Sequence, residues 1–180
     1  APDRSPAWSP DGTKIAFASR RDHNWDIYVV DASGGEPRRL TTHPDYDGAP
    51  SFSPDGQRIA FESYRGGDLN IWVMDADPSA GSGHGGSYQQ NLTSEVTEGD
   101  FGPAWSPDGR FIAFTSWRYG DKDIFLLEVG TGQVTRLTDS PAIEESPVWS
   151  PDGQKLAFVH QEDGARDIYV MDVAHPPAQG

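Results

Sequence analysis

The chain alternates between short apolar runs and polar turn sequences, and the same order recurs four times. In each repeat a run such as "KIAFAS" or "RIAFES" is followed by a polar loop and then by a run such as "DIYVVD" or "NIWVMD". Aromatic and β-branched residues dominate these runs, and turn-forming residues bound them, which is typical of β-strands. The pattern therefore predicts an all-β protein.

Each repeat contains four expected strands in a fixed order. The first is "PAW", "PSF" or "PVW", and the turn "SPDG" links it to the second, because Pro presets φ, Asp bonds the nearby backbone and Gly accepts a positive φ. The loop leads to the third strand, and a shorter fourth strand ends in Leu-Thr at 38–41, 90–93 and 135–138. The third strand is apolar on both faces, which indicates a sheet covered on both sides.

The spacing of the repeats favours propeller blades. The first-strand aromatics are 44, 53 and 44 residues apart, at Trp8, Phe52, Trp105 and Trp149. A period of roughly 40–45 residues with four strands per repeat is typical of β-propellers. The longer spacing comes from a Gly/Ser-rich stretch at 77–90, which we expect to be a flexible surface loop.

The composite motif "PxWSPDGxxIAFxSxR…DIYVMD…RLT" resembles the repeat of TolB-like β-propellers, also described as WD40-like, from Pro6 to about Val173. The resemblance implies a β-propeller or partial propeller of four blades, each a four-stranded antiparallel sheet. We expect one domain over 1–174 and a tail at 175–180. The expected blades cover about 5–41, 49–93, 102–138 and 146–173.

The last blade is expected to lack its outer strand, because Pro176 and Pro177 follow its third strand and oppose a fourth. TolB-like propellers usually have more than four blades, so three arrangements are open. The chain is an excerpt of a longer propeller, an open arc completed by a partner or a second copy, or a four-bladed ring with one thin blade. An arc would expose two blade faces and an unpaired edge.

Composition excludes several classes of function. The formal net charge of −14 argues against nucleic acid as a partner, because phosphates require basic patches. The absence of cysteine excludes disulfides, thiolate catalysis and cysteine-based zinc sites. No apolar run has the length of a membrane span, and no segment has the pattern of a signal peptide.

An acidic residue stands three positions before the Pro that precedes the first-strand aromatic of every repeat, at Asp3, Asp47, Asp100 and Glu144. A second column follows the second strand, at Arg21, Arg65 and Arg118, with Glu162 in the fourth repeat. The strand directions place both columns on one face of the propeller. Two interpretations are open: an Asp–Arg ion pair in each blade or between blades, or a Ca²⁺ site, favoured at Glu144, Glu145 and Glu162, where no arginine is in register. No cofactor is required.

Aromatic residues are expected on the same face, at Trp25, Tyr46, Tyr64, Phe101, Trp117 and Tyr119. Together with the three arginines they are candidates for a peptide- or sugar-binding surface; the alternative is that they cover the blade cores. The aspartates of the "SPDG" turns are interpreted as turn residues on the opposite face.

The sequence favours a non-catalytic protein. The histidines follow no metal-binding spacing, and the chain has no GxSxG motif. The resemblance implies a scaffold for protein–protein contacts, periplasmic or extracellular, docked in a larger and in some cases membrane-associated assembly, with self-association through open blade edges as another expectation. The alternatives are the substrate-gating propeller of a larger hydrolase and a glycan- or peptide-binding module.

Overall fold

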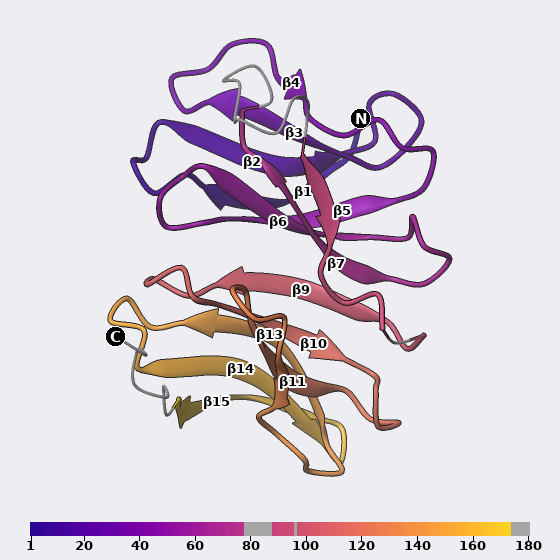
Figure 1. The fold of residues 1–180 in the computed structure, drawn as a ribbon, viewed down its shortest axis with the longest axis vertical. Coiled ribbons are helices and arrows are strands. Elements are labelled where there is room, and N and C mark those ends of the chain that lie inside the picture. Colours follow the sequence, from indigo (N-terminus) through magenta and orange to yellow (C-terminus); the bar gives the residue numbers. More distant parts are fainter. Residues whose placement is uncertain (78–87, 96, 174–180) are drawn as a thin grey trace.

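The computed structural model describes residues 1–77, 88–95 and 97–173, and this part of the chain forms four antiparallel sheets (Figure 1). The first blade contains β1 (Asp3–Trp8), β2 (Lys14–Ser19), β3 (Asp26–Asp31) and β4 (Arg38–Arg39). The second contains β5 (Asp47–Phe52), β6 (Arg58–Ser63), β7 (Asn70–Asp75) and β8 (Gln89–Asn91). The third contains β9 (Asp100–Trp105), β10 (Phe111–Ser116), β11 (Asp123–Glu128) and β12 (Val134–Arg136). The fourth contains β13 (Ile143–Trp149), β14 (Lys155–Glu162) and β15 (Ala165–Asp172).

These sheets confirm the fold class expected from the sequence. Strands follow one another in chain order within each blade, and the fourth blade has three strands among the described residues. The first strands begin earlier than expected, at the acidic column, because Asp3 pairs with Ser19 and Asp47 with Ser63 across the sheet. Most of 77–90 and all of 175–180 lie outside the described residues. In the described part no helix is long and apolar enough to cross a membrane.

The repeated Leu-Thr sequence joins the short fourth strand to the core. Leu40 is buried, and the Thr41 hydroxyl accepts a hydrogen bond from the backbone N–H of Ile27 at 2.9 Å. Thr93 makes the same contact in the second blade and Thr138 in the third. The hydroxyl thus satisfies a buried donor at the start of the third strand, where the fourth strand does not pair.

The blades pack face to face and bury three clusters of apolar side chains. At each junction the Ile and Val or Leu of one third strand meet the first-strand aromatic and second-strand side chains of the next blade. Ile27 and Val29, for example, pack with Phe52 and Phe61. The described strands of the first and fourth blades make no contact with each other, and these blades lie at opposite ends of the molecule in Figure 1. The four blades therefore do not close a ring by themselves.

Candidate interaction face

The molecule has two opposite faces, named here the loop face and the turn face after the segments that form them. The loop face contains the entries to the first strands and the loops after the second strands, since Asp3 pairs with Ser19 at that end of the sheet. The turn face contains the four "SPDG" turns at the other end of these strands. The sequence placed the acidic column, the arginines and the aromatics on the loop face, and the strand directions agree with that prediction.

The acidic and arginine columns form one ion pair in each of the first three blades. Arg65 Nη2 lies 2.6 Å from Asp47 Oδ2, and Arg118 Nη2 lies 2.7 Å from Asp100 Oδ2, with both carboxylates buried. The first blade has a looser and more exposed pair, between Arg21 and Asp3 at 3.5 Å. These contacts fit the ion-pair interpretation.

Each arginine of this column also lies over an aromatic ring of its own third strand. The guanidinium carbon of Arg21 is 4.6 Å from the ring centroid of Tyr28, and that of Arg65 is 5.2 Å from the Trp72 ring. Arg118 covers Phe125 at 5.4 Å. Because the guanidinium groups pair with a carboxylate and stack on a ring, they close the end of each blade and are already engaged within it.

The fourth blade replaces the arginine with a histidine. His160 occupies the position of Ser19 in the first blade, and its Nδ1 lies 3.2 Å from Glu144 Oε1. Its ring stacks on Tyr169 with 4.2 Å between centroids, and its Nε2 lies 3.7 Å from Glu162. One side chain thus partners the buried carboxylate and covers the third-strand ring, as the arginine does elsewhere.

The predicted calcium site has no geometric support in the described part of the chain, where no three His, Asp or Glu side chains are placed to hold a metal ion. Glu145, which has no arginine in register, instead pairs with Lys122 and with Arg166, both at 2.6 Å. Calcium binding by Asp3, Asp47, Asp100, Glu144, Glu145 and Glu162 stays a prediction that rests on residue type alone.

A second type of ion pair joins the third and fourth strands, and it was not predicted from the sequence. Asp26 and Arg39 are 2.6 Å apart in the first blade, and Asp123 and Arg136 are 2.8 Å apart in the third. Burial raises the pKa of Asp26 and of Asp123, although the arginine opposes the shift. The second blade has Asn70 and Asn91 at these positions, so both charges are absent there together. The in-register Asp and Arg were the signal that could have identified the pair.

The first pocket on the loop face lies between the first and second blades and has a volume of about 540 Å³. The guanidinium carbon of Arg4 lies 4.1 Å from the Trp25 ring centroid and 5.0 Å from that of Tyr46. The Tyr46 hydroxyl donates to Glu62, and burial and then this carboxylate raise the pKa of Tyr46. The Tyr46 ring lies so close to Gly48 that a Cβ there would fall 1.8 Å from the hydroxyl oxygen.

The second pocket lies between the second and third blades, beside the first, and has a volume of about 310 Å³. Tyr64 and Leu69 line both pockets, and Phe101 and Trp117 complete the aromatic walls of the second. Five of the six predicted aromatics therefore meet around two adjoining pockets. Tyr119 does not line either pocket, because its ring stacks on Phe125 and lies under Arg136.

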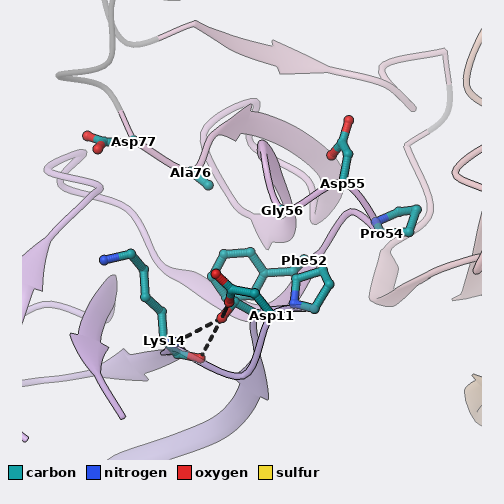
Figure 2. Close-up of a pocket in the computed structure, with 10 residues that line it drawn as sticks. Asp11, Lys14, Phe52, Pro54, Asp55, Gly56, Ala76 and Asp77 are labelled. Carbon is teal, nitrogen blue, oxygen red and sulfur yellow. Dashed lines mark hydrogen bonds between the residues drawn. The ribbon is translucent and has the colours of Figure 1, made fainter. Parts of the chain in front are cut away.

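The turn face has a pocket of its own, about 380 Å³ in volume, between the turns of the first and second blades (Figure 2). Asp11 accepts hydrogen bonds from Ser9 Oγ at 2.6 Å and from Thr13 N at 3.0 Å. These bonds lower the pKa of Asp11 to about 2. The same Ser–Asp contact recurs at Asp55, Asp108 and Asp152. The turn aspartates are thus engaged in closing their turns, in agreement with the interpretation from the sequence.

Three loop-face residues of this arrangement gave no sequence signal. Arg4 is in register with Gly48 and Phe101, so no repeat pattern marks it. Glu62 likewise has no counterpart of the same type in the other blades, and Lys122 has a basic counterpart in the fourth blade alone, at Arg166. Their roles follow from contacts between neighbouring blades, which a comparison of repeats within one sequence does not reveal.

Known proteins resemble this chain in sequence and in fold. The model of the TolB beta propeller domain matches residues 3–100 and 86–179. The Tol-Pal system protein TolB of Methylococcus capsulatus is 48% identical over 48 residues, which are 27% of this chain and 11% of that protein. The structure of TolB from Acinetobacter baumannii superposes with a TM-score of 0.81 at 32% identity, covering 95% of this chain and 41% of that one.

A more distant likeness concerns the fold alone. The structure of a puromycin-hydrolyzing peptidase of Mycobacterium tuberculosis superposes with a TM-score of 0.70 at 18% identity, over 94% of this chain and 27% of the peptidase. The chain thus spans less than half of each protein named here, and each likeness is to a part of a longer polypeptide.

Proposed function

Because this chain belongs to the TolB β-propeller domain family, we propose that it is a non-catalytic protein-interaction module whose docking surface is the loop face. The observation that carries the proposal is the pair of adjoining pockets lined by Trp25, Tyr46, Tyr64, Phe101 and Trp117. Beside them, Asp47 and Asp100 are paired with Arg65 and Arg118 within their blades. Aromatic side chains around concave surfaces are enriched where proteins recognise partners.

The proposal includes the setting of the protein. Relatives are named as components of a Tol-Pal system, and the family resemblance favours an extracytoplasmic, periplasmic subunit of a larger, membrane-associated assembly. The chain covers 41% of the Acinetobacter baumannii TolB structure, so this assignment concerns the domain. The likeness to a peptidase supports a second candidate at the level of the fold only: the substrate-gating propeller of a larger hydrolase.

Selection from a random peptide display library tests the docking surface. We expect enriched peptides to bind the chain, to lose binding to the Tyr64→Ala/Trp117→Ala double variant, and to retain binding to a Gln57→Ala/Gln154→Ala variant. Both aromatic side chains are exposed, and both glutamines are exposed on the turn face. Circular dichroism verifies that the variants fold. No enrichment, or equal binding to both variants, would contradict the proposal.

A further inference from the structure

The second pocket has the composition of a site for a cationic side chain. Its six lining residues are Tyr64, Asp68, Leu69, Gly99, Phe101 and Trp117. Tyr64 is 46% exposed and Trp117 is 40% exposed, so the rings are accessible from solvent. Asp68 is the one charged residue among the six. Aromatic faces attract cations through their quadrupole, and a nearby carboxylate adds charge complementarity.

Gly99 leaves this pocket open. In the sequence it stands where the first junction has Tyr46, whose side chain lines the first pocket. The first pocket is therefore filled in part by a tyrosine of the chain itself, whereas the second has no side chain at this position. A Cβ at Gly99 would lie 3.6 Å from Leu69 Cβ and 3.9 Å from Trp117 Cδ1, which are ordinary contacts.

The Asp68 carboxylate has no basic partner among the described residues. The loop-face carboxylates of the acidic column are partnered: Asp47 by Arg65, and Asp100 by Arg118. No ion pair joins Asp68 to any Lys, Arg or His in the same part of the chain. The pocket thus combines aromatic walls with a carboxylate whose charge the blades leave uncompensated.

Neighbouring contacts show how such rings accept cations in this protein. In the first pocket, the Arg4 guanidinium lies over both Trp25 and Tyr46. Lys122, which does not line the second pocket, places its Nζ 5.0 Å from the centroid of Phe101 and 5.3 Å from that of Trp117. Glu145 balances this lysine charge at 2.6 Å. A further cation in the pocket would therefore meet Asp68, the one charged residue of its lining.

We propose that the second pocket binds an arginine or lysine side chain presented by a basic segment of a protein partner. The cation would lie between Tyr64, Phe101 and Trp117 and pair with Asp68. This inference rests on the proposed function, since it assigns a partner chemistry to the same loop face. The net charge of −14 would favour the approach of such a segment.

A pair of short peptides tests the recognition of charge. The probes are acetyl-Gly-Arg-Gly-amide and the citrulline peptide of the same length, in which a neutral urea replaces the guanidinium. Titration is followed through the Trp117 indole N–H resonance, assigned with a Trp117→Phe variant. We expect the arginine peptide to shift this resonance and to bind about 5- to 10-fold more tightly than the citrulline peptide. Equal affinity for the two peptides would overturn the proposal.

Matched variants test the site. Asp68→Asn should weaken binding of the arginine peptide about 3- to 10-fold and leave the citrulline peptide unchanged. Asp121→Asn removes the same charge at the in-register position of the third blade, outside the pocket lining, and should have little effect. Gly99→Leu, which fills the pocket, should abolish the Trp117 shift. Binding that is insensitive to both Asp68→Asn and Gly99→Leu would place the site elsewhere and refute the inference.

The outcomes separate this inference from the proposed function. Display peptides that require Tyr64 and Trp117, carry no arginine or lysine, and bind Asp68→Asn normally would leave the docking surface intact and overturn the cationic pocket. A library that yields no binder would instead contradict the docking surface, and the arginine peptide titration would still report on the pocket.

Discussion

At the scale of single residues, the repeat is maintained by polar contacts that are copied from blade to blade. The Ser and Asp of each "SPDG" turn bond to each other, and the Thr after each fourth strand accepts from a buried backbone N–H. These side chains satisfy donors and acceptors that the short strands leave unpaired. The recurrence of Asp11 and Thr41 in later blades therefore has a structural cause and needs no binding role.

Replacing Thr41 with Val should destabilise the first blade. The substitution keeps the shape but leaves the buried N–H of Ile27 without an acceptor and removes a donor to Asp26. A buried unsatisfied group costs about 1–3 kcal/mol. Urea denaturation should report this decrease in the free energy of unfolding, whereas Thr42→Val, at the exposed neighbouring position, should change it little. Equal effects of the two substitutions would contradict the assigned contact.

The turn aspartates should make stability depend on acid pH. The pKa of Asp11 is lowered from 3.8 to about 2 in the folded protein, so the folded state favours the ionised form. Its contribution to stability is present above pH 3.8 and is lost as the pH falls through about 2. Thermal melting of Asp11→Asn should show a lower Tm than the parent at neutral pH and a smaller difference near pH 2. A constant difference in Tm across this range would argue against the linkage.

At the scale of the elements, side chains at the end of the second strand and in the loop after it cover the end of each blade, and two different residue pairs occupy these positions. Three blades use a serine and an arginine two residues later, and the fourth uses His160 and Glu162 in their places. Both combinations partner the carboxylate at the start of the first strand, which is buried in the second, third and fourth blades, and cover the third-strand ring. The two differences belong together. His160 performs both tasks, so the fourth blade needs no arginine at the position that Glu162 occupies.

Restoring the Ser–Arg pattern in the fourth blade tests this equivalence. His160→Ser alone should destabilise the protein by about 1–3 kcal/mol, because it removes one partner of the buried Glu144 carboxylate. Adding Glu162→Arg should recover at least half of this loss by supplying a new cation for Glu144. Both variants are measured by urea denaturation. A double variant no more stable than the single one would show that the two residue pairs are not interchangeable.

At the scale of the whole molecule, the first and fourth blades of this chain present complementary faces. Ile27, Ile71 and Ile124 are fully buried against the next blade, whereas Ile168 is 70% exposed at the same position of the fourth blade. At the other end, Trp8 is 62% exposed, although its counterparts Phe52 and Trp105 insert into the preceding blade. A second copy can place its first blade on the fourth blade and repeat the internal junction, in a head-to-tail contact.

We therefore predict that this 180-residue chain associates with itself through these faces. Sedimentation velocity should show concentration-dependent association, and the Ile168→Lys/Val170→Lys variant should shift the distribution to the monomer. Loss of two buried aliphatic contacts weakens an interface by about 3 kcal/mol or more, which exceeds about 100-fold in dissociation constant. Tyr119→Ala, exposed on the loop face, is the control. A strictly monomeric parent chain would contradict the prediction.

The sequence by itself determined the blade. Four repeats of "PxWSPDG" with two apolar runs specify the strands, turns and order, because hydrogen bonding between neighbouring strands and turn chemistry are local properties. The alignment of repeats also predicted the column of Asp47 and Asp100 opposite Arg65 and Arg118. These pairs form within one blade, so residues in register were sufficient to predict them as one of two interpretations.

Only the tertiary structure decided what lies between the blades. The Arg4 contacts, the two pockets and the open ends at Trp8 and Ile168 depend on how one blade is placed on the next. That placement is set by the packing of side chains distant in the sequence, and the residues at the junctions differ from repeat to repeat. Ring closure likewise depends on the relative orientation of successive blades, which the repeat pattern does not specify.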